Sequence, residues 1–107
     1  MSIRRYTTPA YSFTVQGIDL TSADIYVTFK QQDFILTFDG DSVSTALTAL
    51  GDTRIYVFMT QEDTAKFKGG KTAQVQVNWI VDNYRNATDI ATIEITKNLL
   101  ERVIDDE

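Results

Sequence analysis

The chain of 107 residues contains no cysteine and no histidine. Without cysteine there is no disulfide, no thiolate metal site and no cysteine nucleophile. Without histidine the commonest general base, the usual zinc ligand and the serine–histidine–acid triad are also excluded. Only carboxylates, lysines, tyrosines and hydroxyls remain for chemistry, so we expect no enzyme, no bound metal and no cofactor.

Basic charge is scarce. Ten Lys and Arg residues stand against fifteen Asp and Glu, which gives a formal net charge of −5. Binding to nucleic acid or to an anionic membrane needs a basic face. The basic residues form only two short clusters, Arg4-Arg5 and Lys66, Lys68 and Lys71, each beside acids or in an expected loop. The charge pattern therefore predicts neither a nucleic acid nor a membrane as a partner.

Long apolar runs are also missing. No stretch approaches the roughly 20 residues that a membrane-spanning helix needs. The first six residues are basic but lack the apolar middle of a signal peptide. We therefore expect the protein to be made in the cytoplasm and kept there until it assembles or is released with something larger.

Period-two alternation of apolar and polar residues is the main structural signal, and it is typical of half-buried strands. The clearest case is residues 71–81, where Val75, Val77 and Trp79 share one face. Further strands are expected over residues 11–15, 25–30, 34–38, 54–59 and 87–96, and residues 42–50 are ambiguous but favour a strand or an irregular segment. This spacing predicts an all-β fold, an antiparallel β-sandwich of about six to eight strands.

The stretch near residues 60–68 interrupts the strands with one short helical turn. The Thr60 hydroxyl can cap the turn, and the acids Glu62 and Asp63 suit its positive start. Phe67 can fold back as a plug over the end of the core. Gly69-Gly70 then ends the turn, because glycine reaches left-handed backbone angles cheaply.

The chain divides into three parts. Residues 1–9 are expected to form a flexible arm that ends at the only proline, and residues 10–97 form one domain. Residues 98–107 are expected to be an amphipathic, acidic tail. Its closing acids oppose a helix dipole, so any helix there is short or needs a partner.

Two sets of residues have a structural and a functional interpretation. Asp39 and Asp41 could be a catalytic pair or calcium ligands, but neighbours in a tight turn cannot span a sugar bond and the remaining calcium ligands are absent. Turn chemistry explains both acids better. Trp79 could bind a sugar or a peptide, but it is in phase with the valines of its strand and is expected in the core.

Several large apolar residues fall on the nominally outward faces of strands, which is typical of a partner surface. A second sheet, the helical turn or the tail could instead cover them. With the expected turn residue Tyr84 and the tail, the candidate interface comprises Tyr26, Ile35, Tyr56, Phe58, Ile80, Tyr84, Leu99, Leu100, Val103 and Ile104. Exposed aromatics such as Tyr84 and Tyr56 could alternatively bind a carbohydrate or a peptide without catalysis.

Three stretches of the sequence, residues 20–27, residues 60–64 and residues 87–93, resemble the N-terminal domain of phage baseplate upper proteins. Residues 20–27 resemble that family's L-T-G-A lead into a strand. Residues 60–64, with Phe67 and the following glycines, are similar to its T-x-E-E-T…G step, and residues 87–93 resemble its last strand. Two departures are that the chain stops at Glu107, where the family usually continues into a rod or receptor-binding region, and that residues 34–50 are unusually apolar.

The resemblance implies an immunoglobulin-like sandwich that acts as a docking module in a phage or prophage tail or baseplate. Its partners would be copies of itself, larger phage tail proteins, or both. Its location would be the bacterial cytoplasm during assembly and then the virion. The resemblance implies no catalytic residues.

Overall fold

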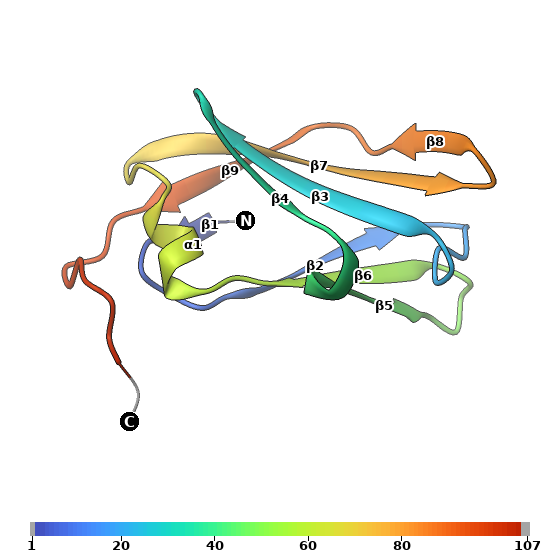
Figure 1. Ribbon diagram of the computed structural model, residues 1–107, viewed down its shortest axis with the longest axis horizontal. Helices are drawn as coiled ribbons and strands as arrows, with labels where there is room; N and C mark the ends of the chain where they lie inside the picture. The colour runs from blue at the N-terminus through green and yellow to red at the C-terminus, as the bar shows by residue number, and fades with distance from the viewer. Residues whose placement is uncertain (1, 106–107) are drawn as a thin grey trace.

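The computed structural model describes residues 2–105, which form two β-sheets packed face to face (Figure 1). Sheet A has the order β1 (Ser2–Arg4), β9 (Ala91–Thr96), β7 (Lys71–Val81), β3 (Asp24–Gln31) and β4 (Phe34–Phe38), with β8 (Tyr84–Ala87) also paired to β7. Sheet B has the order β2 (Ala10–Val15), β6 (Thr53–Phe58) and β5 (Val43–Leu47). Between the strands lie the 3-10 turn η1 (Gly40–Ser42) and the helix α1 (Gln61–Ala65).

The strand order confirms an all-β, immunoglobulin-like sandwich with one short helical turn. Every pairing is antiparallel except that of β1 with β9, which is parallel. The chain crosses between the sheets four times in the Greek-key manner: from β1 to β2, from β2 to β3, from β4 to β5 and from β6 to β7. The described residues hold nine strands rather than six to eight, because the short β1 and β8 were not expected as strands.

The core lies between the inner faces of the two sheets and is organised around Phe29. The ring of Phe29 contacts Tyr11 and Phe13 across the sandwich at centroid distances of 6.5 Å. Phe38, on the neighbouring strand β4, meets Phe29 edge to face at 5.9 Å. The alternation in β3 and β7 puts Val27, Val75 and Val77 beside these rings, and all three are buried as expected.

Helix α1 closes one end of the sandwich. Thr60 caps it as expected: its hydroxyl accepts the Asp63 N–H at 3.1 Å, and the Asp63 carboxylate accepts the Thr60 N–H at 3.0 Å. The chain then turns so that Phe67 is buried, edge to face against Phe29 at 6.2 Å and Phe34 at 5.1 Å. Gly70, at φ 78°, ends the turn and donates to the Ile95 carbonyl. The expected plug is therefore present.

The expected flexible arm over residues 1–9 is wrong in part. Residues 2–4 form β1 at the edge of sheet A, and Ile3 is fully buried opposite Ile95. Ile3 is a single apolar residue between polar neighbours, which is too short an alternation to predict a strand. The strand forms only because Ile3 pairs with Ile95 at the other end of the chain. Met1, also assigned to the arm, is outside the described residues.

The strand expected over residues 87–96 is wrong at its start. Its strand part, β9, begins only at Ala91, whereas Ala87 ends the separate strand β8 and residues 88–90 lie between the two. Thr88 bridges the break: its hydroxyl accepts the Val77 N–H at 3.1 Å, and its own N–H donates to the Val77 carbonyl at 2.9 Å. The hairpin turn is correspondingly shorter than expected, with Asp82 and Asn83 both at positive φ.

Residues 98–105 of the expected tail contain neither helix nor strand, and residues 106 and 107 lie outside the described part. The segment runs beneath α1 (Figure 1), where the Gln61 side chain exchanges two hydrogen bonds of 2.8 Å with the Ile104 backbone. Glu101 forms an ion pair with Arg5. The ambiguous residues 42–50 include the strand β5, in agreement with the expectation of extended chain.

Candidate functional site

The structure divides the strand residues of the candidate interface between two opposite faces. Tyr26, Ile35 and Ile80 lie on the outer face of sheet A, as their registers with Asn78, Lys30 and Arg85 require. Tyr56 and Phe58 lie on the outer face of sheet B, paired with Ser12 and Ala10. Ile35 is 57% exposed and Phe58 is 61% exposed, whereas Tyr56 and Ile80 are half-buried. These residues therefore form two surfaces rather than one.

The other candidate residues lie away from both faces. Tyr84 begins β8, beyond the Asp82-Asn83 turn, and is 77% exposed. The four tail residues are all exposed at the α1 end: Leu99, Leu100, Val103 and Ile104. Phe58 precedes Gln61 by three residues, and Gln61 holds Ile104, so Phe58 and the tail belong to the same end of the molecule.

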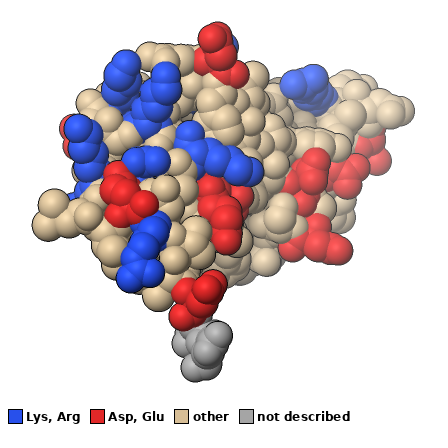
Figure 2. Space-filling model, turned by 60° about the vertical axis from the view of Figure 1, so that its left-hand side comes forward, with Lys and Arg blue, Asp and Glu red and all other residues tan. Residues whose placement is uncertain are grey.

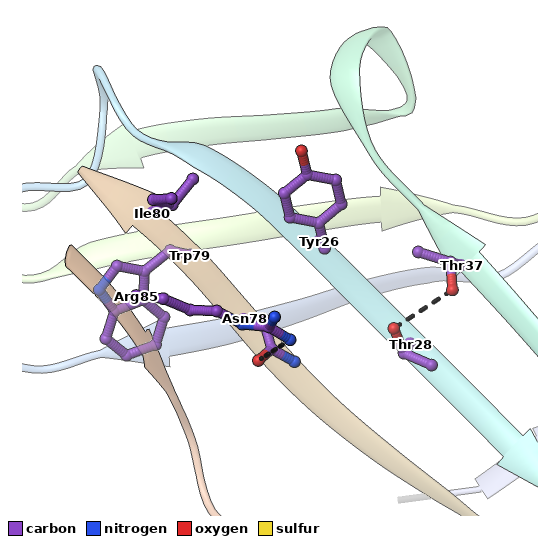
Figure 3. Close-up of a pocket in the computed structure, with 7 residues that line it drawn as sticks. All are labelled: Tyr26, Thr28, Thr37, Asn78, Trp79, Ile80 and Arg85. Atoms are coloured by element: carbon purple, nitrogen blue, oxygen red, sulfur yellow. Dashed lines mark hydrogen bonds between the residues drawn. The ribbon is translucent and has the colours of Figure 1, made fainter. Parts of the chain in front are cut away.

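A shallow groove crosses the outer face of sheet A. It has a volume of about 400 Å³ and is lined by Tyr26, Thr28, Thr37, Asn78, Trp79, Ile80 and Arg85 (Figure 3). Strands β3, β4, β7 and β8 each contribute to it. Trp79 only borders the groove, because it is buried in the core as the alternation predicts.

The groove combines one aromatic ring with hydrogen-bonding groups on neighbouring strands. The Arg85 guanidinium donates to the Asn78 Oδ1 at 3.3 Å, and the Thr28 and Thr37 hydroxyls are 3.2 Å apart (Figure 3). An aromatic face suits the apolar side of a sugar ring or a peptide side chain, while the amide and guanidinium can bind hydroxyls or carbonyls. The groove can bind a ligand, but these groups include no arranged acid–base pair.

The structure also brings together basic residues that the sequence separates. The Arg4 guanidinium donates to the Lys97 carbonyl at 2.6 Å, and Arg5 donates to the Ala65 carbonyl at 2.9 Å. A Cβ added at Gly69 would lie 2.5 Å from the Lys97 Cγ and 3.2 Å from the Arg5 Cδ, so these side chains pack closely around Gly69. Figure 2, which turns the α1 end forward, shows the basic side chains gathered there with acids among them. The two basic clusters thus form one surface of mixed charge.

Titrating groups with shifted pKa values lie outside the groove. Hydrogen bonds from the Thr21 hydroxyl and then its backbone N–H lower the pKa of Asp19 below 3.8. Burial raises the pKa of Tyr11 above 10.0, and its hydroxyl donates to the Ser2 carbonyl at 2.6 Å. The Asp19 carboxylate therefore stabilises the β2–β3 loop, and the Tyr11 hydroxyl joins β2 to β1.

The acids and the helices of residues 2–105 form neither a metal-binding cluster nor a membrane-spanning helix. No three or more acids gather there in a way that could hold a metal ion. Asp39 and Ser42 bond to each other across η1, with the Ser42 hydroxyl accepting the Asp39 N–H at 3.1 Å, as expected for a turn. No helix in this part of the chain has the length and apolar character needed to cross a membrane.

The strand order of the two sheets defines an immunoglobulin-like β-sandwich domain. No family model matches the chain, and no curated protein matches it. Among solved structures the chain is similar to titin A168169, with 14% sequence identity and a TM-score of 0.36. That similarity covers 91% of this chain and 43% of the titin chain, so the chain spans less than half of its length.

Proposed function

We propose that the chain is a non-catalytic protein-docking module of a phage or prophage tail or baseplate. The observation that carries the docking role is the exposure of large apolar side chains on regular strands of both sheets, above all Ile35 and Phe58. Strand positions are fixed by the hydrogen-bonded ladder, so a partner meets a rigid surface and loses little entropy in ordering it.

Burial of these side chains can supply binding energy. Covering one large apolar side chain contributes roughly 1.5–3 kcal/mol. Phe58 lies at the α1 end together with the exposed tail residues, so a partner there can cover an aromatic ring and several aliphatic side chains at once. Aromatic residues are enriched at the centres of protein interfaces, which favours Phe58 as an anchor.

The phage setting is supported by the resemblance of residues 20–27, 60–64 and 87–93 to the N-terminal domain of baseplate upper proteins. The genes beside this one provide an independent test. We expect tail, baseplate or lysis genes, and metabolic genes in their place would contradict the setting while leaving the docking role open to direct measurement.

The docking role itself is tested by measuring association. Sedimentation velocity of the protein, alone and mixed with neighbouring tail proteins, should show a complex that Phe58→Ser weakens at least tenfold. Leu50→Ser is the matched control, because Leu50 is 88% exposed but lies in the β5–β6 turn. A protein that stays monomeric and binds no neighbouring product would contradict the docking role.

The groove on sheet A favours a second candidate, a carbohydrate- or peptide-binding module. A glycan array and a peptide array would identify the ligand. Tyr26→Ala should abolish a specific hit, because Tyr26 lies in the groove, whereas Tyr84→Ala on the hairpin should not. If Tyr84→Ala abolishes binding and Tyr26→Ala does not, the ligand site is the hairpin rather than the groove.

A further inference from the structure

The two flanks of the sandwich differ in how their edge strands are protected. On one flank β4 ends sheet A and β5 ends sheet B, with η1 between them (Figure 1). An edge strand carries unpaired backbone groups, which natural proteins usually shield with charges, proline or a covering segment. Residues 34–38 and 42–50 contain no charged residue and no proline, so the strand positions themselves have none of the usual residue-level protection, and the nearest charges to β4 are the flanking Asp33 and Asp39.

The opposite flank is protected. There β1 ends sheet A and β2 ends sheet B. Arg4 and Arg5 stand at the end of β1, and Pro9 immediately precedes β2. The Tyr11 hydroxyl donates to the Ser2 carbonyl and so joins the two edges. The β1–β2 flank therefore has an arginine within one edge, a proline before the other and a hydrogen bond between the two, whereas β4 and β5 contain no charged residue and no proline.

The side chains of β4 are also incompletely covered. On the inner face Phe34 and Leu36 are only half-buried, whereas Val27 and Phe29 on the adjacent β3 are fully buried. On the outer face Ile35 is exposed beside Lys30. A further strand placed against β4 would cover side chains on both faces and pair its free backbone groups.

The backbone of β4 matches a second copy of itself. The β3–β4 hairpin has a two-residue turn at Gln32-Asp33, which makes Gln31 and Phe34 a hydrogen-bonded pair. Because bonding alternates along an antiparallel pair, the N–H and C=O groups of Ile35 and Thr37 point away from β3. An antiparallel pair of identical edges is self-complementary under two-fold symmetry.

The acids that flank β4 disfavour one register of such a pair and allow another. With Leu36 on the two-fold axis, Asp33 would lie opposite the second copy's Asp39, and like charges directly opposite each other are destabilising. With Ile35 on the axis, Ile35 meets its own copy, Phe34 lies opposite Leu36, and Asp33 lies opposite Thr37. This second register covers the exposed Ile35 and opposes no like charges.

We propose that β4 is a homodimerisation edge that pairs with β4 of a second copy, antiparallel and centred on Ile35. Sheet A then continues across the two copies. The inference deepens the proposed docking role by naming one partner and one surface. The edge is only five residues long, so the dimer forms in a concentration-dependent manner rather than permanently.

The absence of cysteine provides a direct test of the register. Residues in a hydrogen-bonded antiparallel pair have Cα atoms about 5.5 Å apart, within the roughly 4.4–6.8 Å that a disulfide spans. Under mild oxidation Ile35→Cys should therefore form a covalent dimer. Ser12→Cys, on the outer face of the protected edge β2, is the matched control. Equal crosslinking of the two variants would overturn the proposal.

A charged residue at position 35 tests the interface without a covalent crosslink. Ile35→Lys should weaken self-association in sedimentation velocity at least tenfold, while Ser12→Lys leaves it unchanged. Circular dichroism establishes whether each variant is folded. If Ile35→Lys is unfolded, the crosslinking of Ile35→Cys still tests the interface independently. Association lost in Phe58→Ser but kept in Ile35→Lys would overturn the edge and retain the docking role. A wild-type protein that is monomeric at millimolar concentration would overturn the dimer.

Discussion

The two ends of the sandwich are closed by different physical means. At the α1 end the Phe67 ring fills the space between the sheets against Phe29 and Phe34. At the loop end a single buried hydroxyl, that of Thr53, joins the β2–β3 loop to β6. It accepts the Leu20 N–H at 2.8 Å and donates to the Ile18 carbonyl at 2.7 Å. The α1 end therefore adds a buried aromatic ring to its hydrogen bonds, whereas at the loop end the Thr53 hydroxyl joins the loop to β6 beside the buried Leu20.

This difference between the two ends predicts which end contributes more to the free energy of unfolding. A buried aromatic ring contributes through its whole surface, and its removal leaves a cavity. A buried hydroxyl contributes little net energy, but its removal leaves backbone groups without partners. Substitutions at the α1 end should therefore cost more than substitutions at the loop end, and the following predictions test this order.

Phe67→Ala should have the largest effect, a loss of about 3–5 kcal/mol in the free energy of unfolding, because it opens a cavity beside Phe29. Urea denaturation followed by tryptophan fluorescence measures it. Phe58→Ala is the control, since that ring is already exposed and its loss should change stability little. A comparable loss in both variants would mean that Phe67 does not act as a plug.

Thr53→Val should cost about 1–3 kcal/mol, because the shape is kept while the Leu20 N–H and the Ile18 carbonyl lose their partner. Thr64 provides the same test at the α1 end: its buried hydroxyl accepts the Thr7 N–H at 3.0 Å and donates to the Thr7 carbonyl at 2.9 Å. Thermal unfolding of the two valine variants compares the ends directly. If Thr53→Val costs more than Phe67→Ala, the order proposed here is wrong.

Thr60→Ala should cost about 1 kcal/mol, since it removes the hydroxyl that caps α1. Chemical denaturation at neutral pH is sufficient to measure this difference. The matched change Thr8→Ala, at an exposed position, should leave the midpoint unchanged. An unaltered midpoint in Thr60→Ala would indicate that tertiary contacts alone fix the helix.

The smallest effects are pH-dependent and opposite at the two ends. The pKa of Asp19, in the β2–β3 loop, is lowered in the folded state, so its contribution is present above 3.8 and is lost as pH falls through the folded value. The pKa of Tyr11, near the α1 end, is raised, so its contribution is present below 10.0 and is lost as pH rises through the folded value. Melting temperatures of Asp19→Asn in acid and Tyr11→Phe in alkali should depend less on pH than the wild type.

Local patterns predicted much of this fold. The alternation in β3 and β7 gave the correct inner faces, and the Thr60 cap and Phe67 plug followed from short spacings along the chain. The pairing of Ile3 with Ile95 could not be predicted, because it joins the two ends of the chain. The buried roles of Thr53, Thr64 and Gln31 were also missed, since polar residues give no burial signal until their backbone partners are known.

The candidate site was predictable only in part. Alternation identified Tyr26 and Phe58 as outward residues, and both are exposed. It could not assign them to opposite sheets, because sheet membership depends on strand order. The groove escaped prediction for the same reason, as Tyr26, Asn78 and Arg85 come from three strands that become neighbours only in the folded sheet.

Thr88 has a consequence for slow opening motions of the molecule. Its hydroxyl and backbone hold Val77 at the break between β8 and β9, where neither of these two strands has a residue opposite Val77. The Val77 amide should therefore exchange with deuterium as slowly as its neighbours in the wild type and markedly faster in Thr88→Ala. The Thr88 hydroxyl oxygen thus allows the edge formed by the short strands β8 and β9 to resist fraying as one longer strand would.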